Sequence, residues 1–432
     1  MRISGRRNQK TGAVAVVGVL SGIGDNSQTV HHLAGFRFDS SKSGASEQPW
    51  TAYASPSVAP SITNGYQNQA DLAVSPENNK IVISGWGNSN KLQIYDFSVA
   101  KGFNVNSGAA VVTDYVGSAT NELNHVTGMA FSQDKTALAV TSERYVIVYD
   151  WSSGSINQRR WISQAISPSV ATYSSVTFWP YDEEIRSGPD ETVVATLRPA
   201  NIGSGNLLGI YSWALDSSGV NVAPFYTHQI PTGPASGAPV NGWGRPDVPV
   251  SISPKLIGGS RTAFFDTNND TQNPEARRYV FGMYQVSDGA PASYPAGYVG
   301  DGDRINRIYV SYSMFDPHGR AIVARTNSPD IEIYTQSQTD GDFSLLDSYS
   351  AGNTRDSTAF PSWGTRGIIN SMFYDKDRDI LFVCHRGSPY LTAIQMSDRG
   401  FDFKYNDMTS PAPSSFVRAS LVYDEKWKSY NS

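Results

Sequence analysis

The residues best suited to chemistry in this sequence are oxygen-bearing side chains that alternate along the chain. Asp266, Asn268 and Asp270 occupy every second position of one polar segment. Alternating oxygens are the ligands that Ca²⁺ prefers, although this segment lacks the glycine and the distal glutamate of an EF-hand loop. The segment is therefore a weak calcium candidate, and we expect no other metal and no cofactor.

A second alternating run, Asp375, Asp377 and Asp379, stands between two apolar segments. Polar turns occur at the same place in other parts of the sequence, so a hairpin turn is the favoured interpretation of this run. His318 lies in a comparable segment, Asp316-Pro317-His318-Gly319. We expect His318 to be a polar turn residue.

The motifs of common enzyme classes are missing from the sequence. The six histidines show no metal-ligand spacing, and neither a Gly-x-Ser-x-Gly elbow nor a Gly-x-x-x-x-Gly-Lys loop occurs. The sequence therefore predicts no catalytic residues and a protein that is not an enzyme. The single cysteine, Cys384, excludes an internal disulfide, and its apolar neighbours predict a buried strand residue.

Tryptophans and arginines are the more suggestive residues. The pair Trp-Gly occurs three times, and several arginines directly follow apolar segments. Both residue types are enriched in binding hot spots, and tryptophan also stacks on sugar rings. The candidate contact residues are Trp86, Trp243, Trp363, Arg144, Arg198, Arg325 and Arg386.

The composition limits the class of protein. Charged residues make up 17% of the 432 residues, the formal net charge is −5, and aromatic residues reach 12%. These values exclude a disordered tail protein, a coiled coil and a charge-driven binder of nucleic acid. Membrane insertion is not expected either, because no apolar run approaches the ~20 residues of a membrane-spanning helix.

Internal repeats determine the expected fold. The repeating unit is an apolar strand, a polar turn, a second apolar strand and a third strand that carries tyrosine. Its clearest copy comprises Asp71–Glu77, Ile81–Ser84 and Lys91–Asp96. Six four-stranded units at intervals of roughly 45–75 residues are typical of a β-propeller. We expect these six blades at about 70–118, 124–166, 172–230, 245–300, 305–350 and 367–410.

The two ends of the chain supply the strands of one further blade. Ala419–Glu425 repeats a first strand and its turn, and Ala13–Val17 supplies a second strand. His32–Phe38 and Trp50–Ala54 follow as the third and fourth strands. Such a blade closes the ring and leaves no open sheet edge. We predict an all-β protein of one domain, 1–432, with seven blades, six being the alternative; blade 7 combines 10–54 with 416–432.

Two segments allow other interpretations. Arginines before the apolar run Thr11–Leu20 imitate an export signal, but the closing blade favours a strand there and a chain without a cleaved signal. Residues 55–69 are rich in Ser, Ala and Gly, and we expect a surface connection or an arm that reaches a neighbour.

In a propeller, the loops after second strands and those before first strands emerge at the same end, so the candidate tryptophans and arginines would gather around one mouth of the channel.

The repeats resemble those of WD-repeat and lactonase-like propellers. His125–Asp134 is similar to the start of a WD blade, and Tyr149-Asp150 stands where that family has Trp-Asp, although the usual Gly-His pair is absent. Ser328–Tyr334 and Gly387–Leu391 resemble the blades of WD-like propellers in tailed-bacteriophage virion proteins. This second resemblance implies a subunit of the tail, baseplate or neck.

The expected function follows from these features. We expect a non-enzymatic structural component of a tailed-phage virion, made in the host cytoplasm and located in the tail or baseplate. Its partners would be other virion proteins, or a glycan or receptor on the host surface. The alternatives are an exported or cell-surface propeller that binds glycans, favoured by the tryptophans, and a lactonase-like hydrolase. Neighbouring genes for tail proteins would favour the virion component, retention on polysaccharide would favour the glycan-binding propeller, and bound metal would favour the hydrolase.

Overall fold

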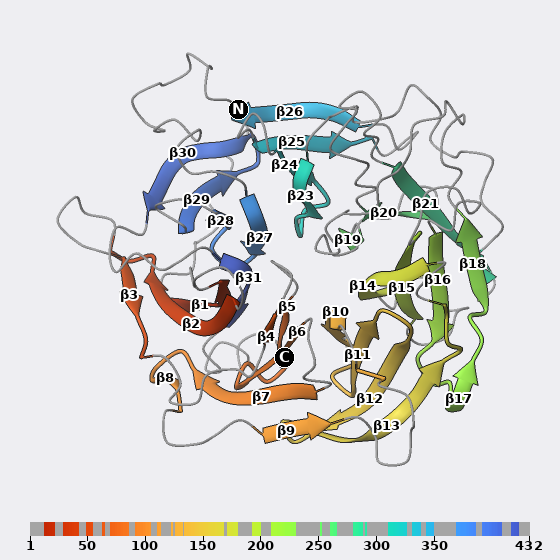
Figure 1. The fold of residues 1–432 in the computed structure, drawn as a ribbon. Coiled ribbons are helices and arrows are strands. Elements are labelled where there is room, and N and C mark those ends of the chain that lie inside the picture. The colour runs from red at the N-terminus through yellow and green to blue at the C-terminus, as the bar shows by residue number, and fades with distance from the viewer. Residues whose placement is uncertain are drawn as a thin grey trace.

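The strands of this protein form a ring of sheets around a central axis (Figure 1). The computed structural model describes residues 13–21, 29–42, 49–54, 63–64, 70–85, 91–104, 110–113, 122–123, 126–132, 134–167, 171–179, 192–199, 209–229, 251–252, 260–265, 280–287, 290–291, 310–325, 331–337, 343–349, 369–385, 391–407 and 416–422. Over these residues every regular element is a β-strand, and seven sheets are present. No helix in this part of the chain has the length and apolarity needed to cross a membrane.

The first three sheets after the closing blade are blades 1 to 3. Blade 1 contains β5 (Ala70–Val74), β6 (Lys80–Gly85), β7 (Lys91–Ser98), β8 (Gly102–Phe103) and β9 (Ala110–Thr113). Blade 2 contains β10 (Val126–Phe131), β11 (Ala137–Ser142), β12 (Val146–Ser152) and β13 (Ser155–Ser163). Blade 3 contains β14 (Ala171–Trp179), β15 (Thr192–Pro199), β16 (Gly209–Ala214) and β18 (Tyr226–Gln229).

Blades 4 to 6 repeat this plan. Blade 4 contains β19 (Ser251–Ile252), β20 (Ser260–Phe265), β21 (Val280–Ser287) and β22 (Ala290–Pro291). Blade 5 contains β23 (Val310–Phe315), β24 (Ala321–Arg325), β25 (Ile331–Gln336) and β26 (Phe343–Tyr349). Blade 6 contains β27 (Ile369–Asp375), β28 (Ile380–His385), β29 (Leu391–Ser397) and β30 (Gly400–Asp407).

Blade 7 is built from both ends of the chain. The innermost strand is β31 (Phe416–Val422), which pairs antiparallel with β1 (Ala13–Ser21). The blade continues outward through β2 (Thr29–Asp39) to β3 (Trp50–Ala52), and β4 (Thr63–Asn64) pairs with the start of β2. The prediction of an all-β propeller closed by strands from the two ends is therefore confirmed, and the segment resembling an export signal is a strand.

The long apolar runs of the second and third strands follow from their position between two neighbouring blades. Successive side chains of a strand point to opposite faces of the sheet. In β1, Val14 and Val16 pack with Phe382 of blade 6, while Ala15 and Val17 pack with Ile81 of blade 1. Because both faces of the blade are covered, no position of the strand tolerates a polar side chain without cost.

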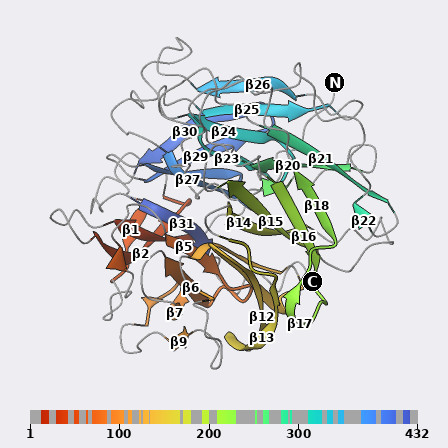
Figure 2. The same ribbon diagram turned by 45° about the vertical axis from the view of Figure 1, so that its right-hand side comes forward.

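One strand connects two blades. β17 (Gly219–Val222) lies in the chain between β16 and β18 of blade 3, yet it pairs in parallel with β13 of blade 2 (Figures 1 and 2). The indole of Trp161 in β13 donates to the Leu215 carbonyl at 3.2 Å, and the indole of Trp213 donates to the Val222 carbonyl at 3.2 Å. This strand covers the outer edge of blade 2, which reduces the opportunity for edge-to-edge aggregation.

Candidate functional site

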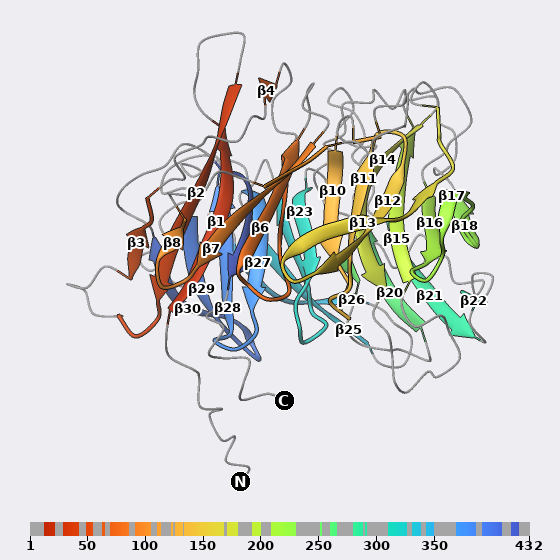
Figure 3. The same cartoon turned by 90° about the horizontal axis from the view of Figure 1, so that it is seen from below.

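The connections between strands emerge at two ends of the ring (Figure 3). In an antiparallel blade, the turn between the first and second strands lies at the opposite end from the loop between the second and third strands. We call these the turn end and the loop end. The predicted contact face belongs to the loop end, because its arginines follow second strands.

The structure describes only part of that predicted face. Arg198 and Arg325 are the backbone partners of Thr172 and Val310 at the ends of β15 and β24. Arg144 is described with its side chain. The remaining contact candidates, Trp86, Trp243, Trp363 and Arg386, lie outside the described residues, as do the calcium candidates Asp266, Asn268 and Asp270.

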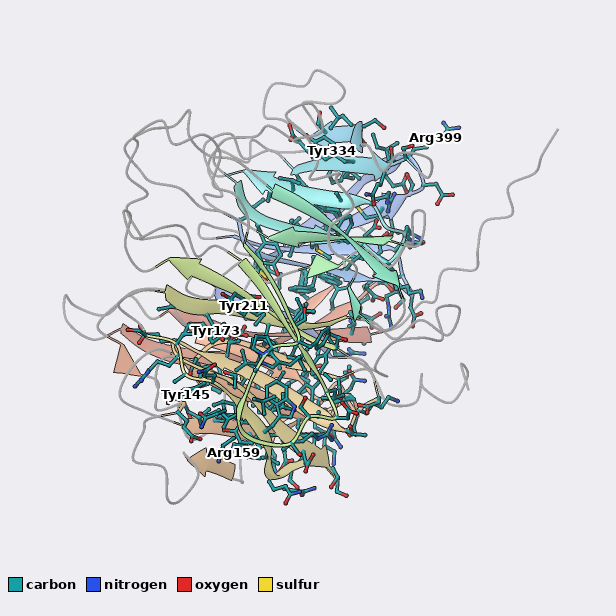
Figure 4. All side chains as sticks on the ribbon, turned by 90° about the vertical axis from the view of Figure 1, so that its right-hand side faces the viewer. Tyr145, Arg159, Tyr173, Tyr211, Tyr334 and Arg399 are labelled. Carbon is teal, nitrogen blue, oxygen red and sulfur yellow. The ribbon has the colours of Figure 1, made fainter. Side chains whose placement is uncertain are left out.

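Arg144 is exposed on the loop between β11 and β12, and the backbone of this loop is tied to the next blade. The Ile166 amide donates to the Arg144 carbonyl at 3.0 Å, and the Tyr173 amide of blade 3 donates to the Glu143 carbonyl at 3.2 Å. The guanidinium carbon of Arg144 lies 5.7 Å from the centre of the Tyr145 ring, within cation–π range. Figure 4 labels Tyr145 and Tyr173 on these two blades. A charged side chain is thus presented to solvent from a loop whose backbone is held.

At the turn end, a buried aspartate–arginine ion pair links one blade to the next, and this arrangement occurs in two successive blades. In blade 5, Asp316 accepts hydrogen bonds from the His318 and Arg320 amides at 2.9 and 2.8 Å, and its second oxygen accepts from Arg320 Nε at 2.5 Å. Arg320 then donates from Nη1 to the Ser397 carbonyl of blade 6 at 2.5 Å. The Asp316 and Arg320 side chains are 0% and 7% exposed, so this ion pair is shielded from solvent.

Blade 6 repeats the arrangement. Arg378 donates from Nη1 to Asp375 Oδ2 at 2.7 Å, and the two side chains are 3% and 0% exposed. Arg378 also donates from Nη2 to the Ala13 carbonyl of blade 7 at 3.4 Å. The predicted hairpin turn over the alternating aspartates is confirmed, since residues 376–379 form a turn between β27 and β28. The sequence did not reveal that Asp375 would hold an arginine.

A histidine–carboxylate contact lies between these two ties. His318 Nε2 is 3.1 Å from Asp379 Oδ1, and Tyr374 donates to the same oxygen at 3.3 Å. Arg320 Nη2 donates to the Tyr374 hydroxyl at 3.3 Å. We call Asp316, His318, Arg320, Tyr374 and Asp379 the inter-blade cluster. His318 does occupy a turn, as predicted, but its contact across the blades was missed; the only available signal was that both segments fill the same turn of successive repeats.

The inter-blade cluster can exchange a proton with solvent through its partly exposed side chains. The His318 and Asp379 side chains are 32% and 31% exposed, so solvent reaches both. Burial raises the pKa of the Tyr374 hydroxyl, and the neighbouring charge of Asp379 raises it further against the influence of Arg320, so the phenol stays neutral. No group of three or more potential metal ligands occurs among the residues that the structure describes.

Comparisons with known proteins place the chain by its fold. No family model matches it, and no curated protein matches its sequence. The periplasmic gluconolactonase of Pseudomonas aeruginosa has a similar structure, with a TM-score of 0.51 and 12% identity, over 95% of this chain and 99% of that one. A Bacteroides fragilis protein, named as a candidate 6-phosphogluconolactonase, gives a TM-score of 0.53 with 11% identity over 95% and 98% of the two chains. The Dos1 propeller gives 0.48 with 10% identity over 95% and 90%.

These structures correct one prediction. The expectation that the protein is not an enzyme, which was drawn from the missing motifs, is contradicted by the two structural neighbours that carry the names of lactonases. At 11–12% identity the similarity shows the architecture and no active site. The chain is a β-propeller, and two proteins named as lactonases are among its structural neighbours.

Proposed function

We propose that this propeller is a structural component of a tailed-phage virion, in the tail, baseplate or neck, that binds neighbouring virion proteins through its loop end. The sequence features behind the proposal are the virion-type repeats Ser328–Tyr334 and Gly387–Leu391 and the low content of charged residues, 17%. A ring closed by both chain ends suits such a role, because the pairing of β31 with β1 fastens the two ends of the propeller to each other.

The observation that carries the proposal is the presentation of Arg144. Its guanidinium is exposed, while the Arg144 and Glu143 carbonyls are hydrogen-bonded to Ile166 and Tyr173. A side chain offered from an ordered backbone loses less conformational freedom on binding, and arginine is enriched at binding hot spots. A glycan or receptor on the host surface could bind to the loop end through the same exposed arginine.

The test is mass spectrometry of particles and complexes purified with the protein. The expected result is tail or baseplate proteins at fixed stoichiometry, with incorporation reduced about tenfold or more by Arg144→Ala, as for a hot-spot residue. Lys101→Ala, an exposed change in the β7–β8 turn at the turn end, is the matched control and should incorporate normally. Isolation of a lone monomer from infected cells, with retention on polysaccharide, would instead favour a glycan-binding propeller.

A lactone hydrolase is the second candidate, favoured by the names of the two structural neighbours with TM-scores of 0.51 and 0.53. The experiment is to incubate the purified protein with gluconolactone and 6-phosphogluconolactone and to follow acid release. Release above the spontaneous rate, lost after heat denaturation, would support this candidate. Release at the spontaneous rate for both lactones would reject these substrates.

A further inference from the structure

The His318–Asp379 contact joins two blades that have no covalent link at this point. His318 belongs to the turn between β23 and β24 of blade 5, and Asp379 to the turn between β27 and β28 of blade 6. The two residues are 61 positions apart in the chain. Figure 4 marks the same two blades by Tyr334 and Arg399.

Both partners are held by their own turns. The His318 amide and the Gly319 amide donate to Asp316, at 2.9 Å each, so the imidazole projects from a fixed backbone. Asp379 has a φ of 53°, and its carbonyl accepts from Gln395 Nε2 at 2.9 Å. The distance between the imidazole and the carboxylate is therefore set by the two blades and not by flexible side chains alone.

Within the inter-blade cluster, the Asp316 carboxylate is paired with a guanidinium, whereas the Asp379 carboxylate faces His318. On its own turn, Asp316 is paired with Arg320. From blade 6, the groups that face His318 are the neutral Tyr374 phenol, whose ring centre is 6.0 Å from that of the imidazole, and the Asp379 carboxylate. With His318 neutral, the two carboxylates and the one guanidinium carry a net charge of −1. One proton on His318 balances the cluster.

We propose that His318 and Asp379 form a proton-dependent tie between blades 5 and 6, which is tighter when the imidazole carries a second proton. Neutral imidazole offers the carboxylate one hydrogen bond, and only in the tautomer with the proton on Nε2. The imidazolium always donates from Nε2, and the attraction between opposite charges adds to that hydrogen bond. The ring would thus be held more firmly at this boundary in acid.

The experiment is amide hydrogen exchange, followed by mass spectrometry of the peptides that cover 316–320 and 376–380, at about pH 5.5 and about pH 7.5. Rates are corrected for the intrinsic pH dependence of exchange. For the native sequence we expect exchange to be slower in acid by up to about fivefold, the factor that corresponds to ~1 kcal/mol, the upper end of the range for a partly exposed ion pair.

Two variants separate proton binding from simple packing. His318→Gln keeps a side chain that can donate to Asp379 but cannot be protonated, and Asp379→Asn removes the charge at a left-handed position that asparagine tolerates. The acid-dependent slowing should disappear in both variants, while peptides from blade 2 keep the same rates throughout. Equal slowing in the native protein and in His318→Gln, or faster exchange of the native protein in acid, would overturn the proposal.

Discussion

Arg378 of blade 6 donates from Nη2 to the carbonyl oxygen of Ala13, which lies 365 positions earlier at the start of β1. The same guanidinium forms an ion pair with the fully buried Asp375. The closing blade is thus attached to its neighbour by a polar bond as well as by the apolar contacts of Val14 and Val16 with Phe382. This bond places the start of the first strand against the last complete blade.

Replacement of Arg378 by methionine should destabilise the ring by about 3 kcal/mol, because it leaves the Asp375 carboxylate buried without an opposite charge. Burial already raises the pKa of Asp375, and Arg378 opposes that rise. Urea unfolding at neutral pH measures the loss. The double variant Asp375→Asn, Arg378→Met should lose clearly less than Arg378→Met alone; an equal loss would show that the charge is not what matters.

Gly400→Ala should be more harmful than Gly219→Ala. Both glycines have positive φ angles, 112° and 96°, which alanine adopts at a cost of roughly 1 kcal/mol. At Gly400 an added Cβ would also lie 2.5 Å from the Cβ of Asp347, whereas at Gly219 nothing lies within 4 Å. Thermal unfolding of the two variants tests the difference, and a larger loss for Gly219→Ala would contradict this explanation.

Asp134 should make stability depend on pH in the acid range. Burial alone would raise its pKa, but hydrogen bonds from Ser132 and Thr136 and the charge of Arg160 hold the pKa below its usual value. A carboxyl with a lowered folded-state pKa stabilises the fold above its unfolded-state pKa, and the contribution is lost as the pH falls through the folded-state value. Because Asp134 is exposed and its charge is screened by solvent, Asp134→Asn should cost only about 0.5 kcal/mol at pH 7, and the difference from the native protein should shrink below about pH 4.

Chemical denaturation at a series of pH values measures this effect. A constant difference between Asp134→Asn and the native protein from neutral to acid conditions would mean that the variant acts through the shape of the turn and not through its charge. Asp398→Asn, a change at an exposed position in the turn between β29 and β30, provides the control and should show little difference at any pH.

Cys384 should not react with thiol reagents in the native ring. Its side chain is 0% exposed in β28, and burial raises the pKa of the thiol, so the reactive thiolate is suppressed. Reaction with an aromatic disulfide should proceed only after denaturant is added. Lys101→Cys supplies an exposed thiol as the positive control, and rapid labelling of Cys384 without denaturant would show that blade 6 opens at that strand.

The sequence by itself determined the features that are recorded within single strands and repeats. The apolar runs of Ala13–Val17 and Ile380–Cys384 predicted buried strands, and the partial repeat at Ala419–Glu425 predicted the shared closing blade. Such features are visible because a strand buried on both faces needs apolar residues at every position over a short stretch of chain. The turn over the alternating aspartates was visible for the same local reason.

Only the tertiary structure decided which side chains meet between blades. Nothing near His318 in the sequence indicates Asp379, and nothing near Gly219 indicates that β17 pairs with β13 of another blade. These contacts depend on how the ring places the turns of neighbouring blades beside each other. The relative position of two neighbouring turns depends on the twist and packing of whole sheets, so it cannot be predicted from the residues of either turn.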